Sequence, residues 1–225
     1  MPRYIEEIVS EQVRRSEIAR QRSAESGKPC PCNVITISRR MGSGARVVAI
    51  KLSEQLGWGL WGKDLIDAVA EDANVSKRVA DAFDERTHSE IELFISSILG
   101  DFDMGGFIFP THLARAVASV AALGNVIILG RGANFLLPDA LHIRIDASDE
   151  RRIQNMMSYE NLTREEAVKK LAESDRERWH YLTKTFGRDR VENFHYDISL
   201  WMDKFTSDDA VEIVKTAIRC RCPAI

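Results

Sequence analysis

Short apolar runs alternate with longer amphipathic segments along this chain, an order typical of α/β proteins. Residues 33–38 are largely β-branched, and the apolar runs 125–129 and 141–145 have the length of strands that are buried on both faces. A turn or cap and then a helical pattern follow these runs. We therefore expect a parallel sheet flanked by helices, with a last strand near 197–201.

Amphipathic segments between and after the strands predict the helices. Thr163 and Glu166 have the spacing of a capping box, so a helix is expected to start there. The Gly-rich segment 101–110 is interpreted as a loop with exposed phenylalanines that covers a substrate. The other predicted helices span 63–72, 76–84, 89–99, 111–123, 174–186 and 207–219.

Residues 4–22 predict an amphipathic helix ahead of the main domain, because their apolar residues recur at helical spacing. A segment with Gly27, Pro29 and Pro31 follows and is interpreted as a linker. The apolar stripe of this helix fits either the domain itself, which is the favoured alternative, or a second copy in a homodimer. We assign residues 1–32 to the helix and linker and 33–225 to one α/β domain.

Composition limits the class of protein. In 225 residues, 44% apolar and 29% charged side chains are typical of a folded, water-soluble domain. The net charge of -3 gives no overall field that would recruit nucleic acid or an anionic membrane, so an anion site must be local. Without a secretory h-region or an apolar run of about 18 residues, we expect a cytoplasmic protein with no membrane span.

The cysteines form two tight pairs, Cys30 with Cys32 and Cys220 with Cys222. One residue between the thiols is fewer than structural zinc sites usually have, so free thiols are favoured over a zinc site. The histidines also lack metal-ligand spacing, and no protein metal site is predicted.

A Gly-rich turn at the end of the first strand is the best candidate for chemistry. Ligands of parallel sheets bind at the carboxyl ends of the strands, which is where Gly42, Ser43 and Gly44 fall. Glycine lets backbone amides approach phosphate oxygens, and the helix that follows points its positive end at them. A plain turn is the alternative for so short a motif, and only its place between strand and helix favours phosphate binding.

Residues 39–46 cover the eight positions of a Walker A loop when they are aligned on the end of the following helix. Only Gly44 matches a defining position. Arg39 replaces the first Gly, Ala45 replaces the Lys, and Arg46 replaces the Ser or Thr that holds Mg²⁺. Either arginine can supply positive charge, but neither can coordinate a metal ion.

The stretch Ile35–Arg46 resembles the cytidylate-kinase-like family of nucleoside monophosphate kinases. The resemblance covers about residues 33–218 and implies a P-loop NTPase-like fold with an NMP-binding region at 63–123 and a lid at 150–190. It also implies phosphoryl transfer from ATP to a nucleoside monophosphate or a similar small acceptor, with Mg²⁺ whose ligand is not identified. The other segments that are similar in order and spacing are Gly130-Arg131-Gly132, Pro138-Asp139-Ala140, Asp146–Arg151 and the set Asp175, Arg178 and Tyr181.

The resemblance implies roles for particular residues. Arg131 is the first choice for the acceptor phosphate, Arg46 and Arg178 for the transferred charge, and Asp175 for orienting a lid arginine. Gly132 departs from the Asp that cytidylate kinases have after this arginine, which leaves the acceptor unidentified. The residues expected at the ATP phosphates are Arg39, Gly42, Ser43, Gly44, Ala45, Arg46 and Arg188.

Two other classes of function stay open. A non-catalytic nucleotide-binding or regulatory module is consistent with the degenerate loop around Ala45 and Arg46. An assembly protein that dimerises through its N-terminal helix is the other, and it predicts no nucleotide binding.

Overall fold

The computed structural model describes residues 3–25, 32–102 and 111–221, and these contain one parallel sheet with the strand order β2-β3-β1-β4-β5. The three apolar runs expected to be strands form its centre, and the predicted last strand is at the edge. The strands are β1 (Val34–Arg39), β2 (Gly59–Trp61), β3 (Val126–Leu129), β4 (Leu141–Asp146) and β5 (Ile198–Trp201).

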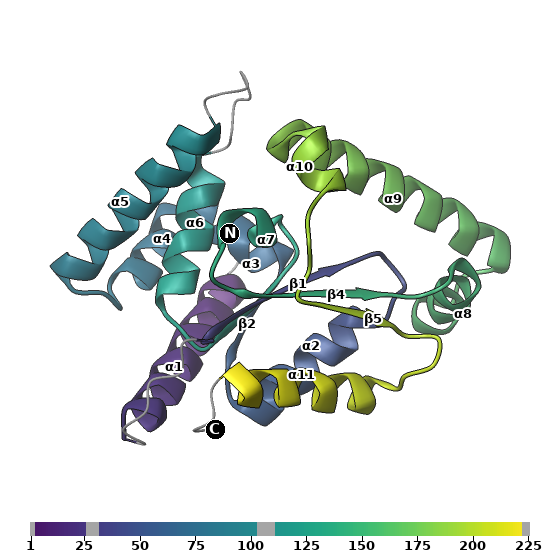
Figure 1. Cartoon of the computed structure of the whole chain (residues 1–225), viewed down its shortest axis with the longest axis horizontal. Coiled ribbons are helices and arrows are strands. Elements are labelled where there is room, and N and C mark those ends of the chain that lie inside the picture. The colour runs from purple at the N-terminus through teal and green to yellow at the C-terminus, as the bar shows by residue number, and fades with distance from the viewer. Residues whose placement is uncertain (1–2, 26–31, 103–110, 222–225) are drawn as a thin grey trace.

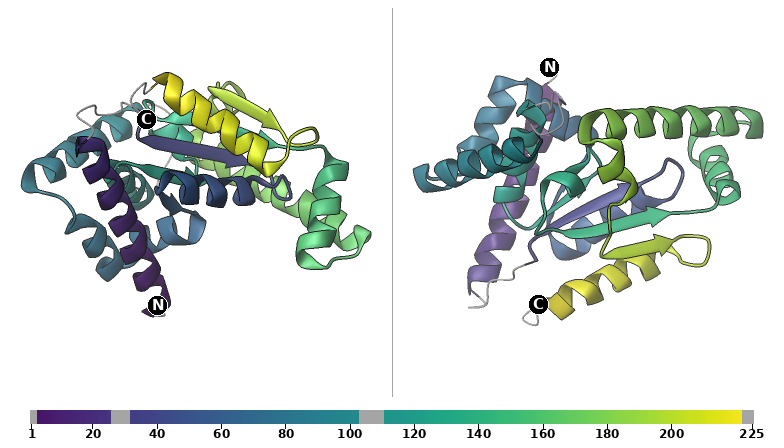
Figure 2. Two further views of the ribbon diagram at one scale, coloured as in Figure 1. Left: turned by 90° about the horizontal axis from the view of Figure 1, so that it is seen from below. Right: turned by 45° about the horizontal axis from the view of Figure 1, so that its top comes forward.

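Helices cover both faces of the sheet, and α8 and α9 project beyond its carboxyl edge (Figures 1 and 2). The helices are α1 (Arg3–Glu25), α2 (Ala45–Leu56), α3 (Lys63–Glu71), α4 (Ala73–Ala80), α5 (Glu85–Phe102), α6 (Thr111–Ala122), α7 (Ala133–Leu136), α8 (Asp149–Glu160), α9 (Arg164–Phe186), α10 (Arg188–Glu192) and α11 (Ser207–Arg221). No described helix is both long and apolar enough to cross a membrane.

The central strands are apolar on both sides because each side packs against helices. Ile35 and Ile37 of β1 join α2 and α11 in one core cluster. On β3, Ile127 belongs to that cluster, whereas Val126 and Ile128 pack with α1, α3 and α6 on the opposite face. The strand pattern at 33–38 and 125–129 therefore predicted burial correctly.

The N-terminal helix packs on its own domain, which was the favoured alternative. Val9 is fully buried and Val13 nearly so in the core cluster with α3, α4 and α6. α1 also covers β2, an edge strand of three residues that the sequence pattern did not reveal. The side chain of Gln12 accepts a hydrogen bond from the Leu60 amide at 2.8 Å, so α1 satisfies the otherwise unpaired edge.

Three predicted element boundaries were wrong. Residues 174–186 are not a separate helix, because α9 continues without a break from Arg164, where the predicted capping box of Thr163 and Glu166 is confirmed. α4 starts earlier than expected because Asp72 caps it by accepting from the Asn74 amide. α5 runs to Phe102, so the expected loop starts in a helix, and its remainder, 103–110, lies outside the described residues.

Candidate functional site

The Gly turn, residues 39–46, joins the end of β1 to the start of α2. Gly42 and Gly44 have φ angles of 78° and 82°, a left-handed conformation that favours glycine. Gly44 is the N-cap of α2, and its carbonyl accepts from the Val47 and Val48 amides at 3.0 and 3.3 Å. The two glycines thus give the sharp reversal that brings the helix N-terminus to the end of the strand.

Side chains of α8 hold the carbonyl groups of this turn. Arg152 donates from Nε to the Met41 carbonyl at 2.7 Å, and Asn155 donates from Nδ2 to the Gly42 carbonyl at 2.7 Å. The carbonyl and amide of one peptide unit point in opposite directions, so the Gly42 amide points away from Arg152. A Cβ on Gly42 would lie 2.8 Å from the Arg152 carbonyl oxygen, and this close approach also requires glycine.

The start of α2 offers donors to an anion. The amides of Gly44, Ala45 and Arg46 have no acceptor among the described residues, as is usual for the first turn of a helix. The Ser43 side chain is 1% exposed, and its hydroxyl also lacks a partner. Nothing lies within 4 Å of the place where a Cβ on Gly44 would stand, so space is open beside these donors.

Three arginines lie around the Gly turn. Burial and the neighbouring charges of Arg178 and Arg46 lower the pKa of Arg39 to about 10. Burial and the charge of Arg144 lower the pKa of Arg178, and Asp175 opposes this shift. A Cβ on Gly130 would lie 2.3 Å from Nη1 of Arg39, so the Arg39 side chain packs directly on the Gly130 backbone. The structure therefore brings together Arg39 and Arg46, which the sequence places close, and Arg178 from α9.

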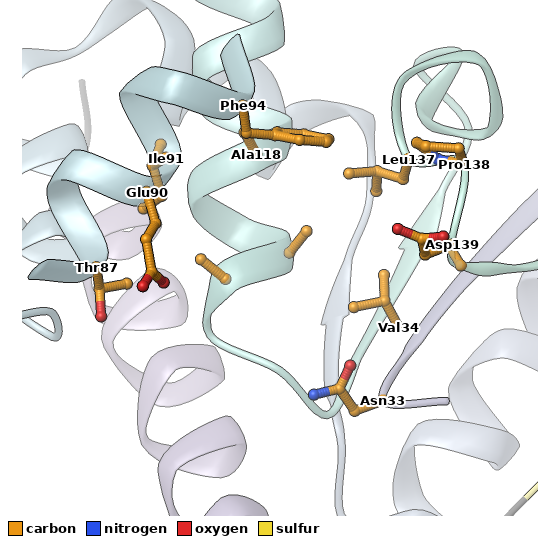
Figure 3. A pocket seen from close by; sticks show the side chains of 13 residues that line it. Asn33, Val34, Thr87, Glu90, Ile91, Phe94, Ala118, Leu137, Pro138 and Asp139 are labelled. Atoms are coloured by element: carbon orange, nitrogen blue, oxygen red, sulfur yellow. The ribbon is translucent and has the colours of Figure 1, made fainter. Parts of the chain in front are cut away.

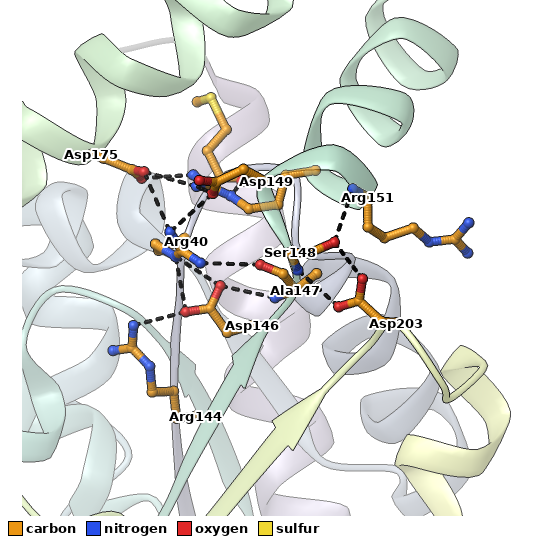
Figure 4. A network of polar contacts seen from close by, with 11 residues as sticks. Arg40, Arg144, Asp146, Ala147, Ser148, Asp149, Arg151, Asp175 and Asp203 are labelled. Carbon is orange, nitrogen blue, oxygen red and sulfur yellow. Dashed lines mark hydrogen bonds and ion pairs between the residues drawn. The ribbon is translucent and has the colours of Figure 1, made fainter.

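The aspartates near these arginines are held by other arginines. Arg40 donates from Nε to both carboxylate oxygens of Asp146, at 2.8 and 2.9 Å, and from Nη1 to Asp149 (Figure 4). Asp175 binds Arg152 through two hydrogen bonds of 2.7 and 2.8 Å. Asp175 was expected to orient a lid arginine, and its direct partner is Arg152 of α8, which lies within residues 150–190 but was not among the predicted site residues.

A second cationic site follows β3, the strand next to β1. Arg131 has a φ of 56° and forms an ion pair with Asp67 of α3. Its Cζ lies 5.4 Å from the centre of the Tyr181 ring, which contributes a cation–π contact. Burial alone would lower the pKa of Arg131, but the hydrogen bond and charge of Asp67 raise it. Arg131 is therefore charged, and Asp67 and Tyr181 fix the position of its side chain.

Arg131 lines a cavity of about 500 Å³. The Nε atom of Arg131 and the hydroxyl of Tyr181 are buried with no hydrogen-bond partner. The charged guanidinium of Arg131 in the cavity wall offers a cation to an anionic ligand. The lining residues are Asp67, Ala70, Glu71, His112, Leu113, Arg131 and Tyr181.

The glycine after Arg131 has a structural reason. Gly132 has a φ of 67°, and a Cβ there would lie 2.2 Å from the Phe186 ring. Phe186 ends α9 and stacks on Phe135 with ring centroids 4.7 Å apart. An Asp at position 132 does not fit beside this ring, so the departure noted in the sequence follows from the packing of α9.

Other predicted residues lie apart from the Gly turn. Arg188 is exposed and pairs with Glu192 of its own short helix at 2.7 Å, and no contact of the described chain joins it to the turn. Cys32 is buried and Cys220 is exposed, whereas Cys30 and Cys222 fall outside the described residues. The described part of the chain holds no group of three metal-ligating side chains.

An apolar cavity of about 440 Å³ lies at the opposite edge of the sheet (Figure 3). It is lined by Asn33 and Val34 at the amino end of β1, by Ile91 and Phe94 of α5, and by Leu137. This cavity is far along β1 from the Gly turn and offers no arginine to an anion, so it is not the candidate site.

The donor set at the Gly turn does not fit the Mg²⁺ that the resemblance implied. Arg46 stands where a hydroxyl would bind the ion, and its side chain is exposed. The nearby carboxylates of Asp146 and Asp175 are already bound by arginines. Within residues 39–46 the only side-chain oxygen is the Ser43 hydroxyl, which has no partner, and no nearby carboxylate is available to complete a cation site with it.

The parallel strand order, the Gly turn after the central strand and the helices beyond the carboxyl edge define a P-loop NTPase-like α/β fold. Within this class the chain belongs to the cytidylate kinase-like family, whose model matches residues 34–204. The expected fold and family are thus confirmed.

Known relatives agree with this assignment. The chain is 27% identical over 192 residues to the cytidylate kinase of Pyrococcus furiosus, covering 84% of this chain and 90% of that protein. It is 26% identical over 187 residues to the cytidylate kinase of Pyrococcus horikoshii, covering 82% and 88%. A crystal structure of an uncharacterized protein from Eubacterium ventriosum is similar in fold, with a TM-score of 0.52, 22% identity and coverage of 82% and 97%.

Proposed function

We propose that this protein is a nucleotide kinase that transfers a phosphoryl group from ATP to a nucleoside monophosphate, CMP or a similar small phosphate acceptor. The family supports the kinase class, and relatives at 26–27% identity are named cytidylate kinases.

Two cationic sites on neighbouring strands carry this proposal. β1 and β3 pair in parallel with Ile37 opposite Leu129, so the Gly turn and Arg131 leave the sheet side by side. One site offers helix amides and arginines, and the other offers Arg131 in a cavity. Two phosphate-binding sites next to each other are what transfer between two phosphorylated molecules requires.

The residues have distinct roles in this mechanism. The amides of residues 44–46 bind the donor phosphates, and Arg131 holds the acceptor phosphate through its planar donors. An oxygen of the acceptor phosphate forms a bond to the γ-phosphorus of ATP while the bond from that phosphorus to the β–γ bridging oxygen breaks. ADP leaves with the bridging oxygen. Arg46 and Arg178 stabilise the charge that shifts between the two nucleotides.

The test is an assay of ADP formation with ATP and a panel of nucleoside monophosphates, repeated with Arg131→Lys. Lysine keeps the charge but loses the bidentate fork, so KM for the acceptor should rise about tenfold or more. KM for ATP should change much less. Arg115→Lys on α6, an exposed arginine paired with Glu92, is the matched control and should leave both values unchanged.

Two results contradict the proposal. A rise in KM for ATP alone would mean that Arg131 belongs to the donor site. If the wild type binds nucleotide but transfers nothing to any acceptor, the protein is a binding or regulatory module, which the loss of the loop Lys at Ala45 favours.

A further inference from the structure

More positive charge lies at the Gly turn than the neighbouring aspartates neutralise. Arg39, Arg46 and Arg178 form no ion pair with any described residue, although Arg39 and Arg178 are half-buried. Burial and the charges of Arg178 and Arg46 lower the pKa of Arg39 to about 10, and burial and the charge of Arg144 lower the pKa of Arg178. Like charges held together at this cost indicate a site that is completed by a polyanion.

The acidic side chains nearby are bound by other arginines, although the charge of Asp175 partly opposes the lowering of the Arg178 pKa. Asp146 accepts from Arg40 and from Arg144, whose Nη2 lies 2.8 Å away. Asp175 accepts from Arg152 and lies 3.9 Å from Arg40. The network that fixes the turn is thus internally balanced and leaves three arginines unmatched.

We propose that the Gly turn binds the nucleotide phosphates as the metal-free anion, and that Arg39, Arg46 and Arg178 supply the positive charge that Mg²⁺ supplies in related sites. This inference rests on the proposed function, because it concerns the donor nucleotide of that reaction.

Electrostatics favour this form for two reasons. Mg²⁺ cancels about two of the negative charges of ATP, so the metal complex is attracted less strongly to three guanidinium groups. A cation beside the turn would also be repelled by Arg46, which occupies the place of the hydroxyl that binds it elsewhere. Guanidinium groups can instead bind phosphate oxygens directly and in pairs.

The experiment measures ATP affinity by calorimetry in EDTA and in excess Mg²⁺, at equal ionic strength because salt screens charges. We expect affinity to be about tenfold or more higher in EDTA. Equal or tighter binding in Mg²⁺ would overturn this inference and leave the proposed kinase function standing. Absence of ATP binding in both buffers would overturn both. Inorganic tripolyphosphate should show the same preference, because the arginines contact phosphates and not the base.

Three variants test which groups select the anion. Arg39→Gln, Arg46→Gln and Arg178→Gln should each weaken ATP binding in EDTA about tenfold and reduce the preference for EDTA over Mg²⁺. Arg46 is exposed, so its replacement should not disturb folding. Arg219→Gln, an exposed arginine near the far end of α11, should change neither quantity. If all three variants lose ATP affinity but keep the same preference for EDTA over Mg²⁺, these arginines do not select the metal-free anion.

Discussion

At the scale of single residues, Gly42 and Gly44 have similar backbone angles but different surroundings. A Cβ on Gly42 would meet the Arg152 backbone, whereas a Cβ on Gly44 would meet nothing within 4 Å. Gly42 is therefore required by packing. Gly44 is required by conformation, and its open side lies beside the amides of α2 that we propose bind an anion.

We predict that Gly44→Ala weakens ATP binding about tenfold or more while the protein still folds. The added Cβ stands where phosphate oxygens approach, and the left-handed conformation costs about 1–2 kcal/mol for alanine. Calorimetry and thermal unfolding measure the two effects. Gly57→Ala at the other end of α2 is the control, because its φ of 68° gives similar strain away from the turn. Equal ATP affinity in the Gly44→Ala and Gly57→Ala variants would show that Gly44 does not contact the nucleotide phosphates.

At the scale of elements, the short strand β2 depends on the N-terminal helix. Its three residues pair with β3 on one side, and α1 covers the other side. Gln12, 8% exposed, provides the acceptor for the Leu60 amide, and the Ser16 hydroxyl lies 2.7 Å from where a Cβ on Gly59 would stand. α1 is thus part of the domain core and not only an appended segment.

We predict that Gln12→Met lowers the free energy of unfolding by about 1–3 kcal/mol, because it leaves the Leu60 amide buried without an acceptor. Denaturant unfolding measures the loss, and faster hydrogen exchange at the Leu60 amide shows its origin. Gln21→Met on the exposed face of α1 should be near neutral. Unchanged exchange at Leu60 would mean that β2 does not depend on this contact.

At the scale of the whole molecule, Arg152 connects the Gly turn with α8 and α9. Its side chain is almost fully buried, and it donates to the Met41 carbonyl, to Asp149 and to Asp175. These contacts link the candidate donor site to the helices that project beyond the sheet, including the helix that carries Arg178. The position of the turn and those of α8 and α9 are therefore coupled through one side chain.

We predict that Arg152→Met costs about 3–5 kcal/mol of stability, because it leaves the half-buried Asp175 without its partner and frees the Met41 carbonyl. ATP affinity should fall as well. Denaturant unfolding and calorimetry measure both. Arg164→Met, which breaks an exposed pair with Glu150, is the control and should cost less than about 1 kcal/mol. A similar small loss in both variants would show that Arg152 does not hold the site together.

The local sequence pattern was sufficient to predict those elements whose determining residues lie close together in the chain. The central strands could be predicted because both of their faces are buried, and the Gly turn because its left-handed backbone angles favour glycine. The capping box of Thr163 and Glu166 could also be predicted, because its two residues are only three positions apart in the sequence.

The tertiary structure decided the contacts that join distant segments. β2 is too short to show a period, and its contacts with β3 and α1 join it to the sheet. The pairing of Arg152 with Asp175 and the approach of Arg178 to Arg39 depend on how α9 folds over the sheet edge. Sequence alone determined which arginines were candidates for the site. Only packing decided which carboxylates neutralise some of them and leave others for an anion, because an ion pair depends on distance in space and not on separation along the chain.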